Sequence, residues 1–487
     1  MKITLPSLLI VSLTFLLVSC TTAQAEPAAY QPYYFVTAPP DSTATPTPFQ
    51  PINLVSSAAQ PVILPTHAQT LVTATLPPLI VTSTPFPTAS APAEAQPMPE
   101  LVTTPQPLID APDTITFLLL GSDLRSGQSY RTDTIVLAII RPRDGQVSLI
   151  SIPRDLWVNI PTVGMQRINT AFQYGEIYGY SGGGAGLLKD TLLFNFGLQI
   201  DHTALVDFDG FRRIIDTLGG IDVPIFCPYT DWRLIDPSYD PEDENNWTLF
   251  TAGPGLIHMD GDYALWYARS RKKSNDFDRG RRQQEVLRSI YAQALRTNTL
   301  ASLPQLYSDF STTIQTDLGL GDILQFAPLA LHLNNADIRS YYIAGDLVIP
   351  WITPGGAYVL LPNTELIQQT INTALAASPR QQERQALTVE IQNGSPYDGW
   401  DALVAERLNY AGYDTSFNLA DNRDHAQTLL YDLTSDQDRT RSASLLASLG
   451  LPDSALVSVP TANSRTSYAV IVGSDYNACF DPQGLAP

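Results

Sequence analysis

The sequence predicts an α/β fold, in which a mixed central sheet is covered by helices and a smaller α/β domain follows at the C-terminal end. Between residues 113 and 376, continuous apolar runs suited to buried strands alternate with segments of helical periodicity. The same alternation returns in residues 387–480, after the short polar stretch PRQQERQ at 379–385. We therefore predict a larger domain, a hinge at 377–386 and a smaller domain.

The first 112 residues are predicted to precede the folded part. Lys2 is followed by a short apolar run, Leu8–Val18. The run leads into Leu17-Val18-Ser19-Cys20, which resembles a bacterial lipobox. Residues 1–20 are thus expected to be a lipoprotein signal peptide, with Cys20 lipidated and the chain membrane-anchored outside the cytoplasm. An ordinary secretory peptide or an uncleaved anchor would export the chain as well. Residues 21–112, rich in Pro, Thr, Ala and Ser, are predicted to form a disordered stalk.

Composition excludes several classes of function. The formal net charge is -20, with only 28 Lys+Arg, which argues against a nucleic-acid partner. Five scattered histidines show no zinc-like spacing, and three cysteines are too few for a disulfide scaffold. Cys227 and Cys479 could pair in an oxidising compartment. Because they fall in different predicted domains, we expect buried or unpaired thiols instead.

The larger domain begins with three strands. Apolar runs predict strands at Ile115–Leu120, Ile135–Ile140 and Val147–Ile152, and Asp144-Gly145 favours a hairpin between the last two. Helical and strand patterns then alternate: helices at Ile168–Tyr178, Leu187–Phe196 and Phe211–Leu218, and strands at Thr203–Phe208 and Ile221–Phe226. Residues 226–244 are polar and contain proline, which predicts an irregular surface segment.

The remaining elements follow the same rules. In the larger domain, helices are predicted at Tyr263–Ala268 (capped by Asp260), Leu303–Phe310 and Asp322–Leu333. The smaller domain is predicted to contain strands at Leu387–Ile391, Thr428–Tyr431 and Tyr468–Val472 and helices at Trp400–Tyr410 and Arg439–Leu449. Gly412 and Gly450 stand where helices commonly end.

One segment near the middle of the chain, Tyr267–Arg288, is rich in lysine and arginine, although the chain as a whole is acidic. It contains Arg269, Arg271, Lys272, Lys273, Arg279, Arg281, Arg282 and Arg288. A helix starting near Asp278 as its N-cap would place Gln283, Arg282 and Arg279 on or beside one inward stripe. Such a stripe should border a cavity that holds an anion, because buried arginines need a counter-charge. The alternative is an exposed basic face paired with the neighbouring acids Asp276, Asp278 and Glu285.

Polar residues also stand at the ends of the predicted strands. Asp123 follows the first strand, Asp133 precedes the second, and Arg154 follows the third. If the strands are neighbours, these side chains meet at one sheet edge. Two carboxylates suit Mg²⁺, and arginines suit phosphate oxygens, so the set is suited to phosphoryl transfer. Each aspartate alone is equally explained as a turn or cap residue.

Several motifs together resemble the LytR-CpsA-Psr family. They are GSDLR and the RTDT after it, SIPRD, RIN, the run Val206–Val223, YARSR and RGRRQQ, in the family's order across Thr114–Ile290. Residues 387–475 resemble the LytR C-terminal domain. The resemblance implies an extracytoplasmic, membrane-anchored phosphotransferase that moves a glycopolymer from a polyprenyl-pyrophosphate carrier to peptidoglycan or a similar wall glycan. The family commonly uses a transmembrane helix, whereas this chain has a predicted lipid anchor.

The resemblance also implies roles for particular residues. Asp123 and Asp133 would hold Mg²⁺ and, with Arg154, form the catalytic set. The pyrophosphate would be bound by Arg131, Arg154, Arg269, Arg271 and Arg279, with Gln283 completing the polar wall. A lipid-binding pocket would lie beside them, lined by helices such as Leu187–Phe196 and Phe211–Leu218, although ordinary core explains any one of their residues as well.

Three alternatives remain open on the sequence. The same pocket transferring to water would make the protein a pyrophosphatase on polyprenyl-pyrophosphate lipids. A non-enzymatic wall-binding lipoprotein would work through its C-terminal domain. Gly179–Gly183 matches the G-x-S-x-G motif of serine hydrolases, but it follows a helical pattern, whereas a nucleophile elbow follows a strand.

Overall fold

The computed structural model describes residues 104–123, 131–271, 275–297, 307–308, 310, 313–333, 335–377, 387–434, 439–461 and 466–480. The predicted signal peptide with Cys20, nearly all of the stalk and most of the hinge fall outside these residues, as does most of the helix expected at Leu303–Phe310. Within the described part of the chain, no helix combines the length and the apolar character needed to span a membrane.

A six-stranded sheet forms the centre of the larger domain. Its order is β11 (Ile314–Thr316), β6 (His202–Asp207), β1 (Ile115–Ser122), β2 (Thr132–Arg141), β3 (Gln146–Ser151) and β12 (Ile338–Tyr342). Strands β1, β3, β6 and β12 share one direction, and β2 and β11 run against them. The mixed sheet is therefore confirmed. We call the edge where β1, β3, β6 and β12 end and β2 begins the carboxyl edge.

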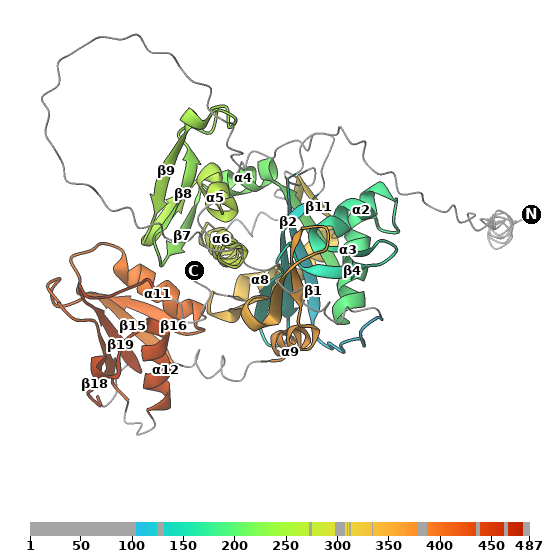
Figure 1. Cartoon of the computed structure of the whole chain (residues 1–487). Coiled ribbons are helices and arrows are strands. Elements are labelled where there is room, and N and C mark those ends of the chain that lie inside the picture. The colour runs from blue at the N-terminus through green and yellow to red at the C-terminus, as the bar shows by residue number, and fades with distance from the viewer. Residues whose placement is uncertain are drawn as a thin grey trace, which may run out of the picture. The chain divides into compact units, whose positions relative to one another are not determined.

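Helices cover both faces of this sheet (Figure 1). On one face, α3 (Gly183–Phe196) and α9 (Thr364–Leu375) pack against residues such as Leu118 and Leu137. On the other, α6 (Asp276–Arg296) and α8 (Leu320–His332) pack against Phe117 and its neighbours. Because side chains alternate along a strand, burial on both faces requires the continuous apolar runs seen in the sequence.

The hairpin between β2 and β3 turns at Arg141–Gly145 as predicted, with Gly145 at a φ of 59°. The helix expected at Ile168–Tyr178 is a 3₁₀ turn (Ile168–Thr170) followed by α2 (Ala171–Ile177). A small hairpin of β4 (Trp157–Ile160) and β5 (Gly164–Arg167) lies before it and was not predicted. Gly182 caps α3, so Ser181 lies in a turn between two helices, and the nucleophile-elbow alternative is wrong.

A second group of elements follows β6. It contains α4 (Phe208–Thr217), α5 (Gly261–Arg269), the pair β7 (Ile221–Ile225) and β10 (Gly255–Met259), and the hairpin of β8 (Tyr229–Leu234) and β9 (Trp247–Ala252). The expected irregular segment at 226–244 is therefore partly wrong. Its first half is strand β8, whose partner β9 lies beyond the polar, proline-containing turn. Asp260 caps α5 as predicted, accepting a hydrogen bond from the Tyr263 amide at 2.8 Å.

The C-terminal domain is a five-stranded sheet with two helices. The order is β16 (Asp414–Asn418), β15 (Thr388–Asn393), β19 (Tyr468–Val472), β17 (Leu429–Asp432) and β18 (Leu456–Ser458). Helices α11 (Trp400–Tyr410) and α12 (Thr440–Leu449) bury leucines against it. The smaller α/β domain is confirmed, and β16 and β18 are additions to the predicted strands.

Cys227 and Cys479 are joined by a disulfide bond, so the expectation of buried or unpaired thiols is wrong. The two residues are 252 positions apart, and no local pattern reveals such a pair. Phe226, beside Cys227, belongs to the same apolar cluster as Ala478, beside Cys479. The bond therefore connects the segment after β7 to the segment after β19.

Candidate functional site

The carboxyl edge carries an irregularity at which a predicted site residue stands. Gly121 pairs with Thr134 and Ser122 pairs with Thr132, so Asp133 is an extra residue in the ladder. A β-bulge of this kind redirects a side chain, and bulges are frequent beside functional sites. Asp123, half-buried, directly follows β1 at the same edge.

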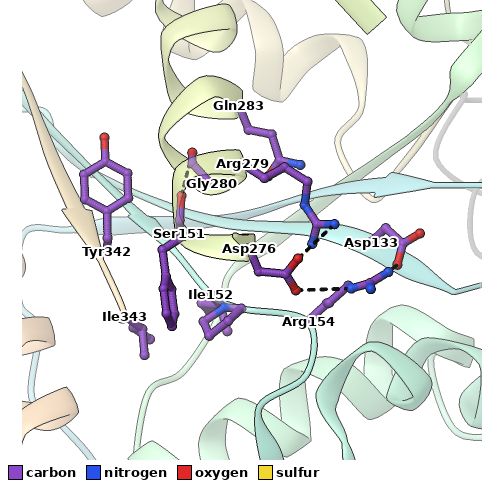
Figure 2. Close-up of a pocket in the computed structure, with 12 residues that line it drawn as sticks. Asp133, Ser151, Ile152, Arg154, Asp276, Arg279, Gly280, Gln283, Tyr342 and Ile343 are labelled. Carbon is purple, nitrogen blue, oxygen red and sulfur yellow. Dashed lines mark hydrogen bonds and ion pairs between the residues drawn. The ribbon is translucent and has the colours of Figure 1, made fainter. Parts of the chain in front are cut away.

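Beside Asp133 lies a small hollow of about 20 Å³, which is room for roughly one water molecule (Figure 2). Its lining comes from the start of β2, the segment after β3, the first turns of α6 and the end of β12. The lining residues are Asp133, Ser151, Ile152, Pro153, Arg154, Asp276, Phe277, Arg279, Gly280, Gln283, Tyr342 and Ile343. Four of the predicted site residues are thus brought together: Asp133, Arg154, Arg279 and Gln283.

Arg154 is surrounded by carboxylates. Its Nη1 donates to Asp133 Oδ1 at 2.7 Å, and its Nε lies 3.5 Å from Asp155 Oδ2 and 3.4 Å from Asp276 Oδ2. Burial alone would lower the pKa of Arg154, but Asp133, Asp276 and Asp155 outweigh it and raise that pKa. Burial raises the pKa of Asp155, and the adjacent Asp276 raises it further. Arg154 is therefore a fixed positive charge.

Arg279 reaches the hollow from the first turns of α6. It is buried, and its Nη1 lies 3.3 Å from Asp276 Oδ1. Burial lowers the pKa of Arg279, and Arg154 adds to this by repulsion, while Asp276 opposes it. One turn further, Gln283 Nε2 donates to Thr134 Oγ1 at 2.8 Å. The predicted inward stripe of Arg279 and Gln283 is thus confirmed as part of the lining.

The helix that carries this stripe begins earlier than predicted. Asn275 is the N-cap, and its side chain accepts a hydrogen bond from the Asp278 amide at 2.7 Å. Asp278 as the N-cap was therefore wrong. Both residue types cap helices well, but the Asp278 carboxylate is engaged by Arg281 at 2.6 Å and Arg282 at 3.1 Å.

Arg282 lies on the predicted stripe but has a different task. It is 0% exposed and donates to the backbone carbonyls of Tyr267 and Ser270, at the end of α5. Its guanidinium also lies 4.0 Å from the centroid of the Tyr229 ring. Arg282 therefore fastens the end of α5 to α6 and does not line the hollow.

The other predicted site residues do not line the hollow. Arg131 directly precedes β2, with its side chain exposed. Arg269 is the last residue of α5, and its guanidinium lies 3.8 Å from the ring centroid of Phe208, the residue after β6. Arg271, half-buried, follows two positions later. Asp123, Arg131 and Arg269 thus stand at the carboxyl edge.

Two carboxylates of the site were not among the predicted site residues, although the exposed-face alternative named Asp276 as a partner of the basic segment. Asp276 lines the hollow and faces both arginines, and Asp155 pairs with Arg154 and, at 3.3 Å, with Arg167. The available signal for Asp276 was its position three residues before Arg279 on one helix. The signal for Asp155 was only its adjacency to Arg154.

The helices expected to line a lipid-binding pocket bury their apolar residues in core clusters. Leu187, Leu192 and Phe196 of α3 pack with the central sheet, and Ile215 of α4 packs with β7 and α5. Ordinary core, the alternative that the sequence left open, accounts for these residues. The lipid-binding pocket stays a prediction.

The carboxylates at the carboxyl edge could bind a magnesium ion only together with waters and the phosphates of a bound substrate. Across the described ranges, no group of three His, Cys, Asp or Glu side chains is placed to hold a metal. Magnesium, however, is commonly bound by one or two carboxylates, waters and the phosphates of a substrate. Asp123, after the end of β1, and Asp133, at the start of β2, stay the predicted donors of such a set.

Gly280 offers a test of how closely α6 must approach the sheet. A β-carbon at this position would lie 3.2 Å from Ser151 Cβ, a tight contact with the end of β3. We expect Gly280→Ala to shift the first turns of α6, and with them Arg279, by a few tenths of an ångström. The rate of whatever reaction the site catalyses should fall about tenfold, while the midpoint temperature of thermal unfolding changes by only a few degrees. Gly321→Ala, on α8 with nothing within 4 Å, is the control.

Comparison with known proteins adds independent findings. A model described as the LytR_cpsA_psr family matches residues 86–375, more than half of the chain. A second, described as the LytR cell envelope-related transcriptional attenuator, matches residues 386–476.

Curated relatives are named polyisoprenyl-teichoic acid–peptidoglycan teichoic acid transferases. TagU of Oceanobacillus iheyensis is 32% identical over 215 residues, which cover 43% of this chain and 60% of the relative. TagV of Bacillus subtilis is 28% identical over 276 residues, covering 55% and 66%. The match thus spans less than two thirds of these relatives. The crystal structure of B. subtilis TagV superimposes with a TM-score of 0.43 and 24% identity, covering 56% of this chain and 100% of that one.

Proposed function

The chain belongs to the LytR-CpsA-Psr family, and we propose that it is a phosphotransferase that moves a glycopolymer from a polyprenyl-pyrophosphate carrier to peptidoglycan or a related wall glycan. The observation that carries the proposal is the convergence of Arg154 and Arg279 beside Asp133 at the carboxyl edge. The names of the relatives, teichoic acid transferases that act between a polyisoprenyl lipid and peptidoglycan, support the same class of reaction.

In the proposed reaction, a hydroxyl oxygen of the wall glycan attacks the phosphorus that bears the glycopolymer. The bond between that phosphorus and the bridging oxygen breaks, polyprenyl phosphate leaves, and the hydroxyl proton is released. Phosphoryl transfer needs chiefly in-line positioning and neutralisation of the phosphate oxygens. Arg154 and Arg279 supply fixed donors for those oxygens. Bound Mg²⁺, held by Asp123 and Asp133, would supply further positive charge at the diphosphate.

The proposed location is outside the cytoplasm, with the folded part on a stalk anchored through lipidated Cys20. The disulfide between Cys227 and Cys479 supports this location, because such bonds persist in oxidising compartments. A sulfur pair in a reducing cytoplasm would remain as thiols. The test is mass spectrometry of the membrane-bound protein, which should show a diacylated N-terminal Cys20 and no residues 1–19.

The activity is tested by incubating the full chain, purified in detergent, with a polyprenyl-diphosphate glycan, Mg²⁺ and peptidoglycan fragments. We expect glycan attached to peptidoglycan through a phosphodiester, with release of polyprenyl monophosphate. Release of the lipid without attachment, at the same rate with and without acceptor, would identify a pyrophosphatase. A protein that retains wall glycan but shows no turnover with any such donor would be a binding lipoprotein.

Removal of the metal gives a further prediction. We expect chelation with EDTA to abolish transfer and added Mg²⁺ to restore it, because Asp133 and Asp276 cancel the formal charge of Arg154 and Arg279 in the lining. Asp133→Asn should raise the Mg²⁺ concentration needed for half-maximal activity by about tenfold or more. The control is Asp144→Asn, which also breaks an Asp–Arg pair, at the opposite end of β2. An unchanged Mg²⁺ requirement in Asp133→Asn would contradict the proposed metal role.

A further inference from the structure

One carboxylate occupies the position between the two arginines of the hollow. Asp276 Oδ1 lies 3.3 Å from Arg279 Nη1, and its Oδ2 lies 3.4 Å from Arg154 Nε. Figure 2 shows both pairs as dashed lines that meet at this one carboxylate. A bidentate anion bridging two guanidinium groups has the geometry in which arginines bind a phosphate group. Asp276 therefore stands where an anionic ligand would be expected.

The fit of Asp276 to the two arginines is poor. Charge-assisted hydrogen bonds between nitrogen and oxygen are about 2.7–2.9 Å long, and both of its contacts are longer. Arg154 Nε is buried and lacks a hydrogen-bond partner, although two carboxylates lie near it. In contrast, Asp133 forms a 2.7 Å hydrogen bond with the same guanidinium. Asp276 also contacts the Asp155 carboxyl, which raises the pKa of Asp155. Of the two acids in the lining, Asp276 is therefore the one with the longer contacts to the arginines.

The hollow cannot accept a diphosphate in this arrangement. Its charged lining consists of Arg154 and Arg279 against Asp133 and Asp276, so the formal charges cancel. Its volume of about 20 Å³ leaves room between these side chains for about one water molecule. The Asp276 side chain is 21% exposed and can turn toward solvent, which would free both arginines and enlarge the space. One rotation thus removes both obstacles.

We propose that Asp276 is a displaceable counter-ion, which holds Arg154 and Arg279 in the empty site and is replaced by a phosphate group of the substrate. The proposal rests on the proposed function, in which the site takes a lipid diphosphate. Competition from Asp276 lowers the affinity for the diphosphate and for the monophosphate product by the same factor. The lower affinity for the monophosphate speeds its release after transfer.

The alternative role for Asp276 is to position the arginines, and the two roles predict opposite results. If Asp276 competes, Asp276→Asn frees the arginines and tightens anion binding. If Asp276 positions them, the same change loosens the arginines and weakens binding. A gain in affinity is informative because misfolding cannot produce it.

The experiment is calorimetric titration of the full chain in detergent with inorganic pyrophosphate, first in EDTA and then with Mg²⁺. Asp276→Asn is expected to bind pyrophosphate at least about fivefold more tightly in EDTA, the factor for two unit charges about 4 Å apart in water. Inorganic phosphate, the probe for the product, should gain by the same factor. Asp276→Glu keeps the charge and should bind as weakly as the natural protein. Asp398→Asn, which breaks an exposed Asp–Arg pair in the C-terminal domain, is the control.

The outcomes separate this proposal from the proposed function. Unchanged or weaker pyrophosphate binding in Asp276→Asn overturns the counter-ion role, even if the natural protein transfers glycan normally. If neither protein binds pyrophosphate and neither turns over the lipid donor, the proposed function has failed and the counter-ion role fails with it. Tighter binding in Asp276→Asn and in Asp398→Asn alike would reflect net charge alone and would also overturn it.

Discussion

Arg154→Ala is expected to lower the rate of glycopolymer transfer by about 10²–10³-fold, the usual effect of removing one preorganised donor from a developing negative charge. Arg154 is the residue on which the carboxylates of the site converge, since it contacts Asp133, Asp155 and Asp276. Without it, Arg279 would be the one arginine left among the residues that line the hollow. The loss should appear in kcat/KM, measured with the lipid donor at saturating acceptor.

Two comparison variants sharpen this result. Arg154→Lys keeps the charge but loses the planar fork of donors, so it should recover only part of the activity. Arg143→Ala removes a 77% exposed arginine paired with Asp113 and should leave transfer unchanged. Circular dichroism must show that Arg154→Ala is folded. A folded Arg154→Ala protein with at least a third of the natural rate would contradict the assignment of the hollow as the active site.

The parts of the fold that the sequence predicted well depend on local signals. Continuous apolar runs specify β1, β2 and β3, because strands covered on both faces need apolar residues at every position. The Asp144-Gly145 turn and the Asp260 cap act over a few residues. In contrast, β8 forms only by pairing with β9, which lies beyond a long polar turn. The disulfide likewise joins residues 252 positions apart. Pairing between distant segments is set by packing, which no local pattern shows.

The residues of the site also divide into those that local spacing predicts and those that depend on packing between distant segments. Helical spacing placed Arg279 and Gln283 on one stripe, and the strand ends placed Asp133 and Arg154 at one edge, and these four do line the hollow. Because Arg279 and Arg282 are both buried on the same helix, spacing alone did not show which of the two lines the hollow. The difference comes from the end of α5, whose backbone carbonyls engage Arg282.

The same contacts make Arg282→Met the substitution with the largest expected effect on stability. Methionine fills similar volume, but it leaves the carbonyls of Tyr267 and Ser270 and part of the Asp278 carboxylate without their donor. Breaking a buried ion pair by removing one partner typically costs about 3–5 kcal/mol. Since native proteins are stable by only about 5–15 kcal/mol, this is a large fraction of the total. Arg212→Met is the control, because Arg212 is far more exposed than Arg282, at 36% against 0%, and pairs with Asp209 and Asp262 near the surface. Its loss should cost about 1 kcal/mol or less.

The pH dependence of stability tests whether the Asp278 pair causes this loss. Burial alone would raise the pKa of Asp278, but Arg281 and Arg282 outweigh it, and its pKa lies below the ordinary value of 3.8. The folded state therefore binds this proton less readily than the unfolded chain, and the pair stabilises the protein at pH values above 3.8. That contribution should disappear as the pH falls from 3.8 through the lower folded pKa.

The measurement is urea unfolding of the natural protein, Arg282→Met and Asp278→Asn between pH 7 and pH 3. We expect the free energy of unfolding of the natural protein to exceed that of Asp278→Asn at pH 7, with the difference shrinking below about pH 4. Burial raises the pKa of the nearby Glu285 carboxyl, but Glu285 is present in both proteins and largely cancels in the difference. A difference that stays constant from pH 7 to pH 3 would show that Asp278 acts without its charge. The loss in Arg282→Met would then have to come from the carbonyls at the end of α5, and the ion pair would not be what fastens α5 to α6.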